Sequence, residues 1–174
     1  ETDFVSKNQD FQNFIERLLQ LAIKKQYILE EFLLSDFEET TNVNDALKNI
    51  IAKIGENIVI RRLSYISINS EKSKIGFYIH NKVSENLGKI ACLVKGTSDN
   101  TDKNTADLLK KIAMHVAASK PLALNEQNLD KHTLNREKQI FLEQLSNSGK
   151  PKDIVEKIVD GKVKKFISEI TLLN

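Results

Sequence analysis

The side chains that most often perform covalent chemistry are few and scattered in this 174-residue chain. Its one cysteine, Cys92, lies in the apolar run IACLV, where a buried, inert thiol is the expected role. The three histidines, His80, His115 and His132, are far apart in sequence and lack the spacing of metal ligands. We therefore expect no metal site and no cofactor.

The short motifs of nucleotide and hydrolase sites are missing as well. The sequence contains no GxxxxGK[ST] loop, no GxGxxG turn and no GxSxG elbow. The 26 Lys and Arg residues nearly balance the 24 Asp and Glu residues, so the charge favours neither nucleic acid nor an anionic membrane. A lone cysteine excludes an internal disulfide, and no apolar run approaches the roughly 20 residues that span a bilayer. These features argue against an enzyme.

The elements that would position any site follow from the periodicity of the apolar residues. Helical spacing appears over residues 11–23 and 45–54, with Gly55 as a stop, and over residues 104–120, which end before Pro121. The polar residues 35–44 predict a loop or a short helix. Residues 58–68 are rich in β-branched side chains and predict a strand. Residues 74–80 and 89–95 predict two more strands, with turns at 69–70 and 81–88. Apolar residues on both faces of 90–94 predict a strand covered on both sides.

The last third of the chain has a different character. Residues 126–148 and 152–172 are long, charged, helical stretches joined by the sequence SGKP. Their apolar stripes are narrow, which predicts an antiparallel helical hairpin that projects from the body. Its lysines alternate with acidic residues, so a solvated face is the simplest interpretation. A nucleic-acid stripe is the weakest alternative, because the acidic residues interrupt it.

Several short blocks occur in a defined order along the chain. They are ETDFVSKN (1–8), AKIGENIVIRR (52–62), GKIACLV (88–94), KKIAMHVAASKP (110–121) and SGKPKDIVEKIVDGK (148–162). In this order and spacing they resemble elongation factor Ts over essentially the whole chain. The resemblance implies an α+β fold, with two small subdomains of antiparallel sheets flanked by helices and a protruding antiparallel helical hairpin.

The same resemblance implies a division of the chain. By similarity, residues 1–69 match the first core subdomain, 70–121 the first part of the second, and 122–174 the hairpin, which is a dimerisation-type arm in this family. The family's amino-terminal helical module and the carboxy-terminal part of its second subdomain have no counterpart in the sequence. We therefore interpret the chain as a core fragment.

The function implied by the resemblance is guanine-nucleotide exchange without covalent chemistry. The expected partner is elongation factor Tu, whose GDP is released when magnesium is displaced and the nucleotide pocket opens. A homodimer through the hairpin is expected; a membrane and direct contact with nucleic acid are not. The expected location is the cytoplasm, or the matrix or stroma of an organelle of bacterial descent. Two alternatives are a truncated interaction module without exchange activity and an RNA- or ribosome-associated protein that uses the lysine-rich hairpin.

The resemblance also assigns site residues. Thr2, Asp3, Phe4 and Val5 match the TDFV element that displaces magnesium in the family, with Phe4 as a wedge between partner helices. From residue types alone, the preferred interpretation is that Phe4 packs on its own helix and Asp3 is a solvated cap.

Two histidines are assigned with less support. His80 matches a family histidine that docks on the partner's third domain, and an exposed histidine near a strand end is the equally weighted alternative. His115 belongs to the IAMH block, where a structural role is preferred over partner docking.

Overall fold

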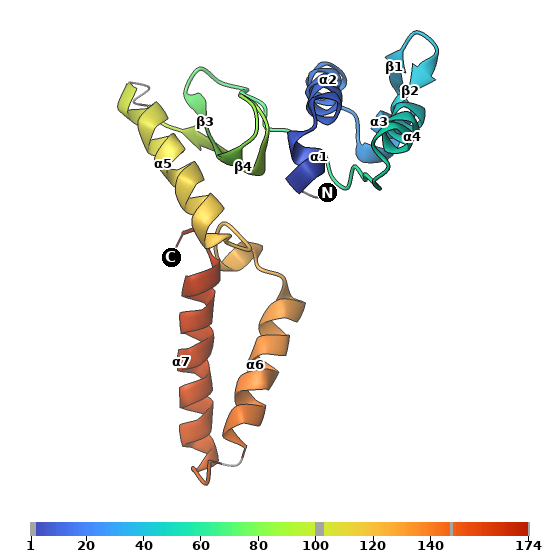
Figure 1. Ribbon diagram of the computed structural model, residues 1–174. Coiled ribbons are helices and arrows are strands. Elements are labelled where there is room, and N and C mark those ends of the chain that lie inside the picture. Colours follow the sequence, from blue (N-terminus) through green and yellow to red (C-terminus); the bar gives the residue numbers. More distant parts are fainter. Residues whose placement is uncertain (1–2, 100–102, 147, 174) are drawn as a thin grey trace. The chain divides into compact units, whose positions relative to one another are not determined.

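The computed structural model describes residues 3–99, 103–146 and 148–173 (Figure 1). The chain divides into two compact units, residues 1–113 and 114–174, with the boundary inside one helix. The fold is mixed helix and sheet with two small antiparallel sheets, as the resemblance implied. The three-part division at residues 69 and 121 stays a prediction.

The first unit begins with helices α1 (Asp3–Lys7), α2 (Gln9–Lys25) and α3 (Leu29–Leu34) and, after a small sheet, continues with α4 (Val43–Ile54). Asn8 caps α2 because its side-chain oxygen accepts hydrogen bonds from the backbone N–H groups of Asp10 and Phe11. Gly55 ends α4 in the left-handed conformation, with φ of 80°. The helices predicted at 11–23 and 45–54 are thus confirmed.

One hydrophobic core joins α2, α3 and α4. Phe32 of α3 and Val43 of α4 are fully buried, and Ile58 joins them from the segment after α4. The remaining buried members are Phe14, Leu18, Ala22, Ala46 and Leu47. Their spacing on α2 and α4 is three or four residues, so each helix buries one stripe and leaves the opposite face to solvent.

The polar segment 35–44 forms a β-hairpin and not the predicted loop or short helix. Strands β1 (Asp36–Glu38) and β2 (Thr41–Asn42) pair antiparallel, and Val43 donates a backbone hydrogen bond to Ser35. Phe37 of β1 packs against Phe14 with its ring tilted, and 5.4 Å separate the ring centroids. A single apolar residue among acidic ones shows no period of two, so this tertiary contact was not visible in the sequence.

The strand predicted over 58–68 is wrong, since no strand is assigned to residues 57–69. β-branched residues disfavour a helix, but a strand also needs a neighbouring strand with which its backbone can form hydrogen bonds. Ile58 packs into the helical core, and the main-chain oxygen of Ser67 accepts a hydrogen bond from the Lys95 side chain. The segment is therefore held through side chains.

The second sheet is a long hairpin of β3 (Ser73–Lys82) and β4 (Gly88–Thr97), as predicted for 74–80 and 89–95. Helix α5 (Lys103–Ser119) places Leu109 over Gly76 and Gly96 on one face. On the other face Phe77 and Leu93 are more than half exposed. The expectation that 90–94 form a central strand covered on both sides is therefore wrong, because among the described residues β4 pairs with β3 alone and Leu93 is exposed.

The second unit contains a short 3-10 helix, Glu126–Asn128, and the helices α6 (Lys131–Leu145) and α7 (Lys152–Ile170). The two helices run antiparallel (Figure 1), and Lys138 of α6 lies 3.7 Å from Asp160 of α7. Gly149 turns the chain with φ of 67°, and Val159 is buried. The predicted helical hairpin is confirmed; in addition, Ala123 pairs in parallel with Thr171 in a short bridge.

Helices able to cross a membrane are not found in the part of the chain that the structure describes.

Candidate functional site

The short helix α1 carries three of the four residues predicted for the TDFV element. Thr2 lies outside the described residues, and Asp3, Phe4 and Val5 open the helix. Phe4 is 87% exposed, whereas Val5 is 2% exposed. Neighbouring positions on a helix point roughly 100° apart, so α1 can bury one side chain and present the next. Phe4 therefore does not pack on its own helix as a staple; Val5 holds the buried position.

A side chain of α2 and two local hydrogen bonds hold α1 in place. The side-chain amide of Gln12 donates to the main-chain oxygen of Ser6 over 2.9 Å. The backbone N–H of Asn8 donates to the main-chain oxygen of Val5 over 3.0 Å. The Ser6 hydroxyl closes the turn by donating to the main-chain oxygen of Asp3. Each of these contacts restrains the backbone on either side of Phe4.

Asp3 is ion-paired and is not a freely solvated cap. The Lys89 Nζ lies 2.6 Å from the Asp3 Oδ1, and both side chains are exposed. Lys89 belongs to β4, so this contact joins the first turn of α1 to the long hairpin. The hydrogen bond from Lys89, and then its positive charge, hold the pKa of the Asp3 carboxyl below its usual value of 3.8.

An apolar groove of about 610 Å³ lies beside α1. It is lined by Leu18 and Ala22 of α2 and by residues 58–63. Asp3 and Lys89 lie at the groove, together with Leu87 from the turn between β3 and β4. A second contact fixes that turn to α2, because the Ser84 hydroxyl donates to the Glu16 carboxylate over 3.0 Å. The hairpin turn and α1 are therefore attached to the same helix.

His80 lies on β3 and is exposed. Its Nδ1 is 3.0 Å from the Tyr78 hydroxyl, and its cross-strand partner is Ile90, which follows Lys89. The start of β4 thus makes two contacts. Ile90 pairs with His80 of β3, and Lys89 binds Asp3 of α1. No catalytic partner for the imidazole, such as a carboxylate or a nucleophile, appears in the contacts of the described residues.

The other singled-out side chains do not join this group. His115 is exposed on α5, in the part that belongs to the second unit, and His132 is exposed on α6. Cys92 is half-buried and not fully buried, because its sheet has only two strands. Among the described residues, no group of three or more His, Cys, Asp or Glu side chains could hold a metal ion.

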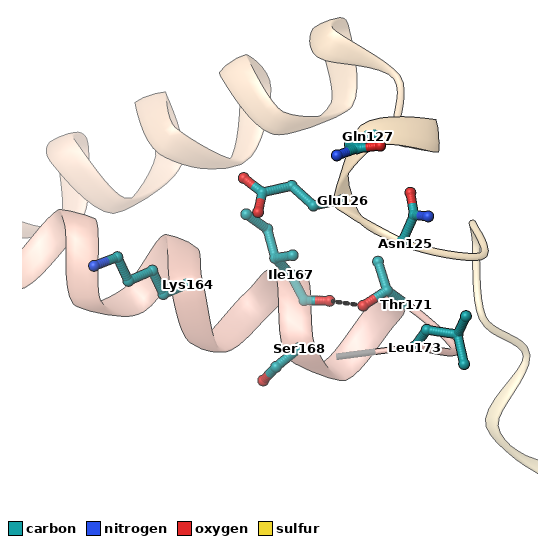
Figure 2. A pocket seen from close by; sticks show the side chains of 8 residues that line it. All are labelled: Asn125, Glu126, Gln127, Lys164, Ile167, Ser168, Thr171 and Leu173. Carbon is teal, nitrogen blue, oxygen red and sulfur yellow. Dashed lines mark hydrogen bonds between the residues drawn. The ribbon is translucent and has the colours of Figure 1, made fainter.

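A second hollow, in the second unit, offers less chemistry. It has a volume of about 380 Å³, and Figure 2 shows the side chains that line it, including Glu126, Lys164 and Ser168. The Ser168 side chain points away from the Glu126 carboxylate (Figure 2), so these residues do not form a nucleophile–base pair. Thr171 donates to the main-chain oxygen of Ile167 over 2.8 Å and serves the end of α7.

Comparison with known proteins decides the family. The family model described as Elongation factor TS matches residues 1–174, which is the whole chain. The chain belongs to the elongation factor Ts family.

Individual members of the elongation factor Ts family show the same relationship. The chain is 40% identical to elongation factor Ts of Rickettsia typhi over 174 residues, which cover 99% of this chain and 55% of that protein. It is also 40% identical to that of Ehrlichia canis, over 100% of this chain and 60% of that protein. The chain therefore spans a little over half the length of the curated relatives it matches.

Sequence reasoning within the elongation factor Ts family missed the residues that support α1. Lys89 is 86 positions away from Asp3, and Gln12 is one of several polar residues on α2. No local pattern marks either of them. Only the fold that brings β4 beside α1 shows that a lysine in the GKIACLV block contacts the TDFV element.

Proposed function

We propose that this chain is a translation elongation factor that promotes release of GDP from elongation factor Tu, without covalent chemistry of its own. The observation that carries the proposal is the 87% exposure of Phe4 on a helix whose next residue is buried. A large aromatic side chain held in water by a restrained backbone is suited to insertion into a partner. Family membership supplies the partner, and the TDFV element supplies the contact.

The mechanism requires that the factor bind two states of elongation factor Tu with different affinities. The factor binds elongation factor Tu more tightly when the magnesium ion and the nucleotide are absent. By thermodynamic linkage, the nucleotide then binds more weakly, by the same free energy, when the factor is bound. Burial of a Phe side chain contributes about 2–3 kcal/mol, which corresponds to a change of roughly 30- to 150-fold in an equilibrium constant.

In this mechanism Phe4 inserts between partner helices and opens the nucleotide pocket. Asp3 brings a carboxylate to the same place, where its charge disturbs the magnesium site. His80, exposed beside Tyr78, supplies docking area on the partner, and His115 stays a lower-ranked docking residue. We infer that α6 and α7 mediate self-association, since the family's hairpin has that role.

The test is release of a fluorescent GDP from the matching elongation factor Tu. The wild-type chain should accelerate release, and Phe4→Ala should reduce the acceleration at least tenfold without lowering the free energy of unfolding. Leu34→Ala is the matched control, because Leu34 is also exposed, at 73%, but lies at the end of α3. The Leu34→Ala variant should accelerate GDP release from elongation factor Tu as much as the wild-type chain does.

A second candidate is an interaction or dimerisation module without exchange activity. The chain's coverage of 55–60% of its relatives is the observation that favours it, since a partial chain can retain binding and lose exchange. Binding to elongation factor Tu with no acceleration of GDP release would support this candidate and exclude the first for this chain.

A further inference from the structure

The α1 helix cannot hold its own conformation. It has five residues, and isolated helices shorter than about 12 residues are marginal in water. The direction in which Phe4 points therefore depends on contacts from outside α1. One such contact is the hydrogen bond from the Gln12 side chain of α2 to Ser6, and another is the ion pair between Asp3 and Lys89. Within α1 itself, the Val5 side chain is buried.

The ion pair differs from the other contacts in what it connects. The Gln12 side chain attaches α1 to α2, the helix that follows it directly in the chain. Lys89 attaches the first described residue of α1 to β4, which is far away in sequence. Lys89 therefore holds the first turn of α1 from an element other than α2. Phe4 follows Asp3 directly, so it is the side chain that this contact orients most.

We propose that Lys89 is a positioning residue of the exchange element, a role that rests on the proposed function. Its ammonium holds Asp3 and thereby keeps the first turn of α1 folded, with Phe4 directed into solvent and ready for the partner. Lys89 acts through Asp3 and needs no contact of its own with elongation factor Tu.

The solvent exposure of Asp3 and Lys89 limits the effect that loss of their ion pair can have. Both side chains of the pair are more than half exposed, and exposed ion pairs make small contributions that salt weakens further. We expect Lys89→Gln to slow the accelerated GDP release by roughly two- to fivefold at low salt. The difference should shrink at 0.5 M salt. Lys89→Arg keeps the charge and should restore most of the wild-type rate.

A matched control exists in the same hairpin. Lys72 makes an ion pair with Asp99, over 2.5 Å and more exposed than that of Lys89, at the opposite end of the strands. Lys72→Gln removes the same charge from the same unit without touching α1. It should leave the rate of GDP release unchanged, so the comparison separates positioning of α1 from a general loss of positive charge.

The deciding measurement does not depend on nucleotide exchange. Amide hydrogen exchange of the free chain, followed by NMR, reports the folding of α1 directly. Lys89→Gln should speed exchange at residues 5–8 by about two- to fivefold, as the same ion pair is lost, and should leave α4 unchanged. Asp3→Asn should have the same effect, and the double variant should add nothing more.

Three outcomes are informative. Faster amide exchange in α1 together with slower GDP release, both restored by Lys89→Arg, would establish the positioning role. Unchanged α1 protection, or wild-type GDP release in Lys89→Gln, would overturn it while leaving the proposed function intact. A wild-type chain that binds elongation factor Tu but does not accelerate release would overturn the proposed function and the positioning role together.

Discussion

Leu109 of α5 lies directly over Gly76 of β3. A Cβ atom built on Gly76 would be 2.5 Å from the Leu109 Cβ and 2.7 Å from its main-chain oxygen. The glycine therefore allows the helix backbone to approach this face of the hairpin closely. Gly96 of β4 lies under the same leucine but meets only the end of its side chain.

This difference predicts unequal effects of two similar substitutions. Gly76→Ala should lower the free energy of unfolding by about 2–3 kcal/mol, because helix backbone blocks the new methyl group. Gly96→Ala should cost less, about 1 kcal/mol or below, since the Leu109 side chain can rotate away. Urea unfolding followed by circular dichroism measures both. Equal losses would show that the helix can move away from the sheet.

Phe32 anchors the helical core of the first unit and is fully buried. Phe32→Ala should lower the free energy of unfolding by about 3–5 kcal/mol, through lost burial and the cavity left behind. Leu34→Ala, two positions along the same helix, should change it by less than about 0.5 kcal/mol. A comparable loss in both variants, measured by urea unfolding, would contradict the assignment of Phe32 to the core.

The ion pair between Asp3 and Lys89 predicts a pH dependence. Lys89 lowers the pKa of Asp3 in the folded state. The pair therefore contributes fully to the free energy of unfolding above pH 3.8, the usual pKa of the carboxyl. It is lost as the pH falls through the lower folded-state pKa. NMR titration of the Asp3 carboxyl carbon should show this lowered pKa, and Lys89→Gln should return it towards 3.8. An unchanged titration would mean that the pair does not form in solution.

Two glycines of the helical hairpin should respond in opposite directions to alanine. A Cβ atom at Gly149 or at Gly161 would meet no atom within 4 Å. Gly149 has a φ of 67°, so Gly149→Ala should destabilise the hairpin by about 1 kcal/mol. Gly161 lies inside α7, and Gly161→Ala should stabilise it by about 1 kcal/mol. Amide hydrogen exchange along α7 would show both changes, and equal signs would contradict them.

The docking role of His80 can be tested by affinity. If His80 contacts elongation factor Tu, His80→Ala should weaken binding by about 1–2 kcal/mol, as expected for an interface side chain. Isothermal titration calorimetry against the partner measures this change. His132→Ala is the control, because His132 is exposed on α6 in the second unit. Equal affinities for the two variants would remove His80 from the interface.

Much of the secondary structure was predictable because it rests on local patterns. Helical spacing marked α2 and α4, Gly55 marked the end of α4, and short stretches between turn residues marked β3 and β4. The same type of signal failed at 58–68, where extended backbone has no partner strand. It also failed at 35–44, where two very short strands pair because Phe37 packs on Phe14.

The sequence by itself determined the family of this protein, through five blocks in a defined order along the chain. It also determined the TDFV element and the helical hairpin, because each of these depends on residue order within a short segment. Only the tertiary structure decided that Phe4 faces solvent while Val5 is buried, and that Lys89 holds Asp3. The physical reason is distance along the chain. Contacts between residues 86 positions apart arise from packing of whole elements, and no local spacing encodes them.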